Sequence, residues 1–221
     1  MRNIALILLG GKGRRMGNDI PKQFIEKNGV PIYIYSIFNY ENVSSITDIV
    51  LVTSKDYFPK VKEDIEKFKI TKVRDIVEGG SERFVSSYFG IKRCFELFNY
   101  NDNILIADAV RPNTSSILIL ANIFALEESP AVLTAIKGSY TGERIDTIHK
   151  KGNTSYLAQT PQSFKLGYIH DLYEAHILED DFFPFDDINV VELSGENYDI
   201  VEGERENYKI TTMEDLKKFL K

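Results

Sequence analysis

The sequence has very little cysteine and histidine for its length. Cys94 is the single cysteine among 221 residues, which excludes an internal disulfide and a cysteine-based zinc site. It lies in a helical pattern, and we expect it in the core rather than as a reactive thiol. The three histidines, His149, His170 and His176, share no metal-ligand spacing, so we expect them to be surface groups.

Long apolar runs and an excess of basic residues are also lacking. No stretch approaches the ~20 apolar residues that a membrane span needs. The short apolar run near Met1 ends in Gly-Gly-Lys, without the cleavage site of a signal peptide. Lys and Arg number 27 against 33 Asp and Glu, and the formal net charge of -6 disfavours a general nucleic-acid surface. We therefore expect a cytoplasmic protein that binds neither membranes nor nucleic acid.

The order of apolar segments predicts one α/β domain over residues 1–221. Short apolar runs alternate with longer amphipathic ones, which is typical of a Rossmann-like, mostly parallel sheet flanked by helices. The expected strands are Ile4–Leu9, Ile46–Thr53, Lys72–Val77, Asn103–Ala107 and Ala131–Ala135. The expected helices are Ile32–Tyr40, Tyr57–Phe68, Ser81–Phe98, Ser115–Leu126, Phe164–Leu178 and Thr212–Leu220, the last with Thr211 or Thr212 as its N-cap.

The segment 137–156 interrupts this alternation. It is polar, contains glycine and has no clear helical spacing. Such a segment is either an excursion from the domain, such as a hairpin arm or a lid, or an ordinary surface insertion, and composition favours neither.

A glycine-rich basic loop follows the first expected strand. Gly10, Gly11 and Gly13 allow a sharp turn that brings backbone N–H groups against an anion. The cations in or near this loop are Lys12, Arg14, Arg15 and Lys22. The spacing fits neither a Walker A loop nor a dinucleotide fingerprint. We interpret the loop as a phosphate-binding site, the alternative being a tight turn with solvated basic residues.

Polar residues also follow two later strands. Gly80 and Ser81, with Ser86 one turn further, open a helix whose free N–H groups suit a base edge, a ribose or a phosphate; an efficient strand-to-helix turn explains them equally simply. Asp108 and Arg111 follow the most apolar strand, where α/β sheets bind ligands. Asp108 suits Mg²⁺ and Arg111 suits an anion, unless the two side chains only pair with each other.

Three further polar segments are ambiguous. The run 159–164 is polar and leads into an expected helix. Asp186 and Asp187 are either metal ligands or, as we expect, a solvated acidic turn or helix N-terminus. Lys209 falls on an expected short strand before the last helix, where it is either a solvated edge charge or a phosphate ligand.

Taken in order, the motifs LGGKGRRM, PKQF, GGSERFVSS, DAVRP, QTPQSF and VEGERENYKITTMEDL cover almost the whole chain. In this order they resemble the cytidylyltransferases that make CDP-linked polyols. That family includes 4-diphosphocytidyl-2-C-methyl-D-erythritol synthase and D-ribitol-5-phosphate cytidylyltransferase, and DAVRP is closer to the ribitol branch. The resemblance implies transfer of CMP from CTP to a polyol phosphate, D-ribitol 5-phosphate before methylerythritol phosphate or another alcohol or sugar phosphate.

The resemblance also implies roles for individual residues. The catalytic residues would be Arg15, Lys22 and Lys209. Residues that bind CTP would be Leu9, Gly10, Gly11, Gly13, Gly80, Ser81, Ser86 and Ala109. Residues on the acceptor side would be Asp108, Arg111 and Thr160, with Asp108 also holding Mg²⁺. The segment 137–156 would be a dimerisation arm that reaches the partner's active site, which makes the protein a homodimer.

The sequence departs from the family pattern on the acceptor side. Ala107 replaces a histidine, Phe185 replaces a threonine, and an Asp-Thr pair and an arginine of the arm have no clear counterparts. An acceptor other than these two phosphates is therefore an alternative. Two other classes, a nucleotide-sensing module and an NAD-dependent dehydrogenase, fit less well. Binding alone would not need Arg15, Lys22, Asp108 and Lys209 together, and a dehydrogenase is disfavoured because Arg-Arg occupies the glycine loop.

Overall fold

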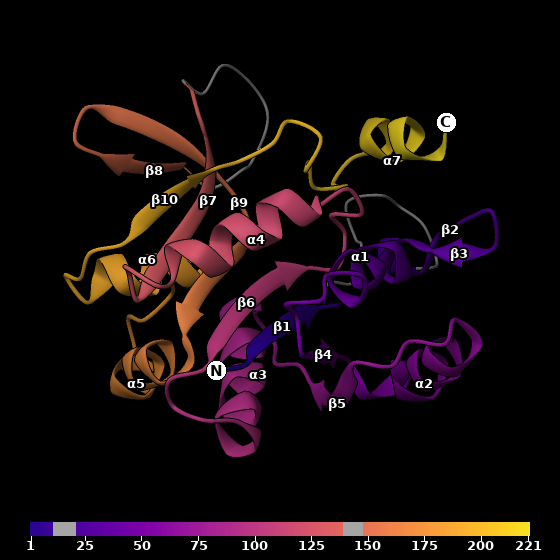
Figure 1. Cartoon of the computed structure of the whole chain (residues 1–221), viewed down its shortest axis with the longest axis horizontal. Helices are drawn as coiled ribbons and strands as arrows, with labels where there is room; N and C mark the ends of the chain where they lie inside the picture. Colours follow the sequence, from indigo (N-terminus) through magenta and orange to yellow (C-terminus); the bar gives the residue numbers. More distant parts are fainter. Residues whose placement is uncertain (11–20, 139–147) are drawn as a thin grey trace.

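The computed structural model describes residues 1–10, 21–138 and 148–221, which form one main sheet with helices on both of its faces (Figure 1). The strands are β1 (Asn3–Leu8), β2 (Glu26–Lys27), β3 (Val30–Pro31), β4 (Asp48–Thr53), β5 (Val73–Glu78), β6 (Asn103–Asp108), β7 (Ala131–Lys137), β8 (Ile148–Lys151), β9 (Thr154–Lys165) and β10 (Asp199–Glu202). The helices are η2 (Lys22–Phe24), α1 (Ile32–Glu41), η3 (Lys55–Tyr57), α2 (Phe58–Lys67), α3 (Arg83–Leu97), α4 (Ser116–Ala125), α5 (Leu166–His176), α6 (Asp187–Leu193) and α7 (Met213–Leu220).

The sheet is mostly parallel, which confirms the predicted fold class. Its strands lie in the order β10-β7-β9-β6-β1-β4-β5, and β8 pairs with β9. The pairs among β5, β4, β1 and β6 are parallel, whereas β9 runs antiparallel to both β6 and β7. The carboxyl ends of β1, β4 and β6 therefore meet at the same edge, where a parallel sheet places its ligands.

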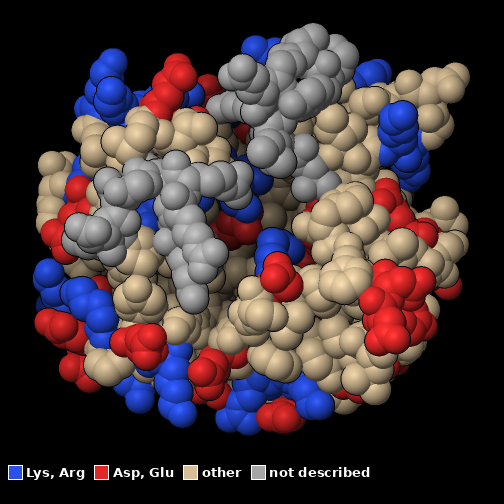
Figure 2. Space-filling view, turned by 180° about the vertical axis from the view of Figure 1, so that it is seen from behind, with Lys and Arg blue, Asp and Glu red and all other residues tan. Residues whose placement is uncertain are grey.

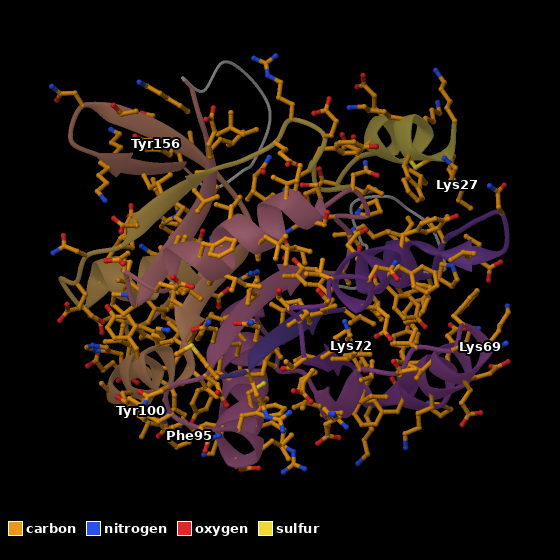
Figure 3. The ribbon with its side chains drawn as sticks, viewed as in Figure 1. Lys27, Lys69, Lys72, Phe95, Tyr100 and Tyr156 are labelled. Carbon is orange, nitrogen blue, oxygen red and sulfur yellow. The ribbon has the colours of Figure 1, made fainter. Side chains whose placement is uncertain are left out.

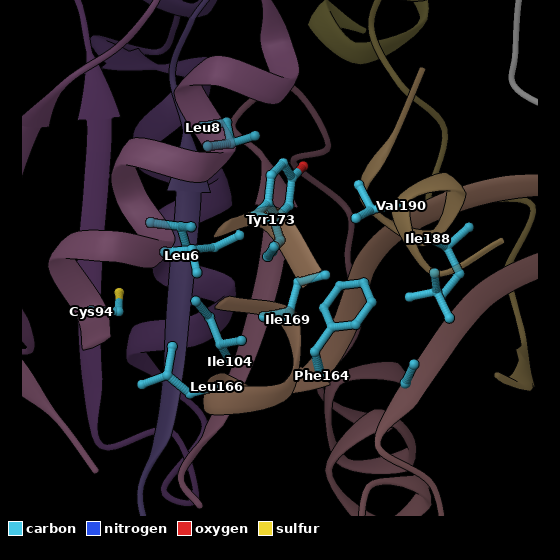
Figure 4. Close-up of a cluster of buried hydrophobic side chains, with 14 of the residues drawn as sticks. Leu6, Leu8, Cys94, Ile104, Phe164, Leu166, Ile169, Tyr173, Ile188 and Val190 are labelled. Carbon is cyan, nitrogen blue, oxygen red and sulfur yellow. The ribbon is translucent and has the colours of Figure 1, made fainter. Parts of the chain in front are cut away.

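Strand β1 shows how the sequence builds a core on each face. Its side chains point alternately to opposite sides, because successive residues of a strand face opposite ways. Leu6 packs with Cys94 and Ile104 on one face (Figure 4), whereas Ile7 packs on the other with the cluster beneath α1. Cys94 is fully buried, as predicted, and burial raises the pKa of its thiol.

The polar run 159–164 does lead into a helix, α5, which begins at Leu166, but the run itself belongs to the antiparallel strand β9, which was not predicted. The polar residues of this run do not look like a buried strand, but their side chains are buried and hydrogen-bonded. Gln162 donates to Asp186, and Ser163 donates to Asn122. Such partners compensate for the burial of amide and hydroxyl groups.

The short strand β2 packs against the C-terminal helix α7. Lys27 of β2 donates to the carbonyl of Phe219 in α7, and its ammonium lies 5.0 Å from the centre of that ring (Figure 3). Thr212 caps α7 in a capping box with Asp215, which confirms the predicted N-cap. Lys209 was predicted on a short strand. It lies instead in an irregular segment. The N–H of Ile210 in this segment donates to the carbonyl of Val110, in the loop after β6, at 2.9 Å.

The predicted excursion 137–156 begins at the end of β7 and includes β8 and the first residues of β9. Strands β8 and β9 form a hairpin to which Tyr156 belongs (Figure 3). Residues 139–147 lie outside the described part of the chain, and the role of the arm in dimerisation stays a prediction. In the part of the chain described here, no helix combines the length and the apolar character needed to cross a membrane.

Candidate active site

Asp108 is the last residue of β6 and stands at the edge of the sheet. Leu8 is its register partner on β1, and the N–H of Ala109 donates to the carbonyl of Leu8 at 3.0 Å. The N–H of Leu9 in turn donates to Val52 of β4 at 2.8 Å. These bonds bring Asp108 and Ala109 to the same edge as Leu9 and Gly10, so the predicted nucleotide loop and the predicted acceptor residues start from neighbouring strand ends.

Three cations surround the Asp108 carboxylate. Lys209 Nζ lies 3.0 Å from Oδ2, Arg111 Nε lies 3.4 Å from Oδ2, and Arg83 Nε lies 3.5 Å from Oδ1. Burial alone would raise the pKa of Asp108, but the positive charges of Lys209, Arg83 and Arg111 outweigh it and hold the pKa well below its usual range. The cluster carries more positive than negative charge, which suits an anionic ligand.

Asn207 fixes the segment that carries Lys209. It is fully buried, and its amide donates to the carbonyl of Thr160 at 2.9 Å. Its side-chain oxygen accepts from Thr114, and its backbone carbonyl accepts from Arg111, at 2.9 and 2.8 Å. Asn207 therefore joins β9, the loop after β6 and the C-terminal segment.

Lys209 is paired with Asp108 and is not the solvated edge charge of the alternative interpretation, whereas its role as a phosphate ligand stays a prediction. Lys22 lies beside the same segment, because its Nζ donates to the carbonyl of Ile210 at 2.8 Å. Burial lowers the pKa of Lys209, and although Asp108 raises it, Arg111 and Arg83 add to the lowering. Basic groups from both ends of the chain thus meet at one edge of the sheet.

Thr160 and Arg111 hold the backbone around Asp108. The hydroxyl of Thr160 accepts the N–H of Asp108 at 3.1 Å, and both residues are buried. Arg111 both pairs with Asp108 and donates to the C-terminal segment, so the alternative of an internal Asp–Arg pair is also present in the structure. Ionic pairing within the site does not exclude ligand binding, since a more highly charged anion competes for the same cations.

Helix α3 begins two residues later than the predicted start at Ser81. Helix α3 begins at Arg83 with Glu82 as N-cap, so Ser81 lies before the cap and is exposed. The N–H of Gly80 donates to the hydroxyl of Ser86 at 3.0 Å. A Cβ on Gly80 would come within 2.2 Å of Val85, so the close turn requires glycine here.

Five predicted residues come together in this structure: Asp108, Arg111, Thr160, Lys209 and Lys22. Gly11, Gly13 and Arg15 lie outside the described residues. Sequence reasoning missed Arg83 and Asn207. Arg83 belongs to the GGSERFVSS motif but was interpreted only as part of a turn, and Asn207 gave no signal because its importance depends on contacts far along the chain.

His149 contradicts the expectation of a surface histidine. It is buried between Asp186 and Glu192, whose carboxylate oxygens lie 2.9 Å from Nε2 and 2.8 Å from Nδ1. Asp186 and Asp187 do begin a helix, α6, but both are buried and paired rather than solvated. Two carboxylates facing one imidazole ring favour its charged form, in which both nitrogens donate.

The described residues contain no group of three or more His, Cys, Asp or Glu side chains arranged to hold a metal ion. On the face in Figure 2, Lys and Arg side chains alternate with Asp and Glu, and a hollow near the centre contains both kinds of charge. Among its described residues this face shows no continuous basic surface.

An α/β sheet with a positively charged cluster at the carboxyl ends of its strands defines an enzyme-like site for anionic substrates. Residues 3–219 match the family model described as IspD, 2-C-methyl-D-erythritol 4-phosphate cytidylyltransferase. The chain belongs to this family of cytidylyltransferases, and it is a nucleotidyltransferase.

Similar proteins carry two different substrate names. The chain is 33% identical to a 2-C-methyl-D-erythritol 4-phosphate cytidylyltransferase of Syntrophus aciditrophicus, over 96% of this chain and 92% of that protein. It is 32% identical to a ribitol-5-phosphate cytidylyltransferase of Streptococcus agalactiae serotype V, over 99% of this chain and 94% of that protein. The crystal structure of 4-diphosphocytidyl-2C-methyl-D-erythritol synthase from Anaerococcus prevotii superimposes with a TM-score of 0.80 at 30% identity, covering 99% of this chain and 94% of that one.

Proposed function

We propose that the protein transfers CMP from CTP to D-ribitol 5-phosphate, giving CDP-ribitol and pyrophosphate. The observation that carries the proposal is that Lys22, from the opposite end of the chain, donates to the carbonyl of Ile210, next to Lys209, which itself pairs with Asp108 beside Arg111. The DAVRP motif and the similarity to a ribitol-5-phosphate cytidylyltransferase support ribitol phosphate as the acceptor.

In the proposed reaction, an oxygen of the acceptor phosphate attacks the α-phosphorus of CTP, and pyrophosphate leaves. Both reactants are anions, so catalysis depends on alignment and on cations that stabilise the developing charge. We assign this role to Arg15, Lys22 and Lys209. The acceptor phosphate is already ionised at neutral pH, and no general base is needed.

The nucleotide side is assigned to the two glycine turns and the strand end beside them. Leu9 and Gly10 follow β1, and Ala109 follows the adjacent β6. The remaining residues proposed to bind CTP are Gly11, Gly13, Gly80, Ser81 and Ser86. Backbone N–H groups of such turns can bind phosphate and a pyrimidine edge without a large side chain.

On the acceptor side we propose Asp108, Arg111 and Thr160, with Asp108 also as a ligand of Mg²⁺. The donor set fits this metal, because Mg²⁺ is often held by one or two carboxylates together with substrate phosphates and water. When bound, Mg²⁺ would reduce the negative charge of the triphosphate. Asp108 is ionised over the working pH range, as a ligand must be, since the surrounding cations lower its pKa.

Methylerythritol 4-phosphate is a second candidate acceptor. It is favoured by the description of the matching family and by the name of the relative from Syntrophus aciditrophicus. The departures at Ala107 and Phe185 also leave room for another alcohol or sugar phosphate. In either case we propose a cytoplasmic homodimer joined through the arm at 137–156.

Pyrophosphate release tests the proposal. The enzyme is given CTP and Mg²⁺ with ribitol 5-phosphate, methylerythritol 4-phosphate or other alcohol phosphates, one at a time, and turnover is compared at equal concentrations. We expect the highest kcat/KM with ribitol 5-phosphate. A higher value with methylerythritol 4-phosphate would overturn the acceptor assignment. Equal use of UTP or ATP in place of CTP would argue against cytidylyl specificity.

A further inference from the structure

Arg83 lies between two carboxylates that come from different parts of the fold. Its Nη1 donates to Asp187 Oδ2 at 2.7 Å, and its Nε lies 3.5 Å from Asp108 Oδ1. The Asp187 side chain is fully buried, and that of Asp108 is 9% exposed. A buried charge without a partner is strongly unfavourable, and Arg83 stabilises both carboxylates in their charged form, together with Lys209 and Arg111 at Asp108.

The two carboxylate oxygens of Asp108 have different partners. Oδ1 faces Arg83, whereas Oδ2 faces Lys209 at 3.0 Å and Arg111 at 3.4 Å. While Arg83 holds Oδ1, the carboxylate does not turn to offer both oxygens to Lys209. A two-oxygen pair would bind the ammonium more tightly and weaken its attraction to a phosphate.

Asp187 anchors Arg83 through Nη1, a different nitrogen from the Nε that faces Asp108. Its Oδ1 accepts from the hydroxyl of Tyr173 at 2.8 Å, and its Oδ2 accepts from Arg83. Asp187 is the first residue of α6, and the preceding Asp186 caps this helix and pairs with His149 of β8. The anchor is therefore fixed by packing and hydrogen bonds on several elements.

We propose that Arg83 is a positioning residue that, anchored on Asp187, sets the orientation of the Asp108 carboxylate and keeps Lys209 available to the reacting phosphates. The inference rests on the proposed function, because it assigns Lys209 to those phosphates. A planar guanidinium suits this role, since its fork can contact two carboxylates at once, whereas a lysine ammonium acts as a point charge.

The test compares Arg83→Lys and Asp187→Asn with the wild-type enzyme. Both variants keep a polar group at the position, and the amide introduced by Asp187→Asn would still offer an oxygen to Tyr173. We expect kcat to fall about 10- to 100-fold, as for a small misplacement of reacting groups, with the KM for CTP changed less than about threefold. Arg93→Lys is the matched control, because Arg93 also lies on α3 and pairs with Asp75 and Glu96 at 2.6 and 2.8 Å. We expect its kcat to be unchanged.

Crystal structures of the same variants give a readout that does not need turnover. We expect the Asp108 carboxylate to rotate so that both oxygens lie within hydrogen-bond distance of Lys209 Nζ. An Asp108 that keeps its orientation in both variants would overturn the positioning role, whatever the kinetics. Absence of wild-type turnover with every acceptor would instead count against the proposed function, and the orientation of Asp108 would still decide the positioning role.

Discussion

At the scale of single residues, the site consists of charges that are costly to bury and are therefore arranged in contact. Asp108 would be unstable in its charged form at this depth without Lys209, Arg83 and Arg111 around it. The three cations in turn retain an excess of positive charge. This excess is what a triphosphate and a phosphorylated alcohol would meet on entering the site.

Replacing Lys209 by alanine removes one of these cations. We expect kcat to fall by about 10²–10³, or roughly 2.7–4 kcal/mol, by analogy with the loss of a preorganised oxyanion donor. The assay is pyrophosphate release from CTP, with the exposed Lys217→Ala on α7 as the control for a lost surface charge. A Lys209→Ala enzyme with near wild-type kcat would remove Lys209 from the reaction.

The lowered pKa of Lys209 predicts an alkaline limit to activity. Burial favours the neutral amine, so the residue loses its charge at a lower pH than the ordinary value of 10.5. We expect kcat/KM to decline below that pH, because a neutral amine no longer stabilises phosphate charge. Arginine stays charged, so Lys209→Arg should weaken or abolish the decline. An identical decline in both enzymes would assign it to another group.

At the scale of secondary-structure elements, the strands and helices that follow from a local sequence pattern could be predicted. Those that depend on contacts between distant residues could not. The strands at β1, β4, β5 and β6 and the helices between them follow from apolar periodicity. Strand β9 was missed because its buried side chains include Gln162 and Ser163, whose hydrogen-bond partners lie on α6 and α4. The capping residue Thr212 was predictable because a cap and its partner are close in sequence.

The same distinction applies to the site. Asp108 and the glycine turns stand at strand ends, which periodicity locates, so their importance could be predicted. The role of Lys209 was not decided by composition, because it depends on Asn207 and on contacts with β6 and β9. His149 was mistaken for a surface residue, since its partners Asp186 and Glu192 lie 37 and 43 residues away along the chain.

His149 predicts how stability depends on pH. Burial lowers its pKa, but the bonds to Asp186 and Glu192 outweigh this effect and raise the pKa to about 9 from 6.5, and Tyr198 also bonds to Glu192. The stabilisation is therefore fully present below about pH 6.5 and is lost as pH rises through about 9. It amounts to on the order of 3 kcal/mol, because one pKa unit corresponds to about 1.36 kcal/mol.

The measurement is the melting temperature of the wild type and of His149→Gln between pH 6.5 and 9.5. We expect the wild type to lose roughly 5–10 °C more than the variant over this range. The variant should also be less stable at the lower pH, because the buried Asp186 and the half-buried Glu192 lose the imidazolium between them. Parallel melting curves with equal pH dependence would show that the imidazolium does not hold β8 to α6.

At the scale of the whole molecule, the sheet edge gathers residues that are far apart along the chain. The segment after β1, the end of β6, the middle of β9 and the segment before α7 each contribute, and the contact between Lys27 and α7 helps to hold the N-terminal part of the chain against the C-terminal helix. A site of this kind exists only in the folded protein. It therefore depends on packing between the N-terminal and C-terminal parts of the chain.

The proposed homodimer is tested at the same scale. We expect light scattering coupled to gel filtration to give about twice the mass of one 25.3 kDa chain. Removal of residues 139–147, with a short glycine linker in their place, should lower this mass and leave the melting temperature nearly unchanged. A wild-type protein that elutes as a monomer at micromolar concentration would contradict the proposal.

A crystal structure of the protein with CTP tests the central proposition most directly, namely that cations from both ends of the chain act on one triphosphate. We predict that Lys22 Nζ and Lys209 Nζ each lie within hydrogen-bond distance of phosphate oxygens of the same nucleotide, with Asp108 beside them. A triphosphate bound away from both ammonium groups would contradict the account.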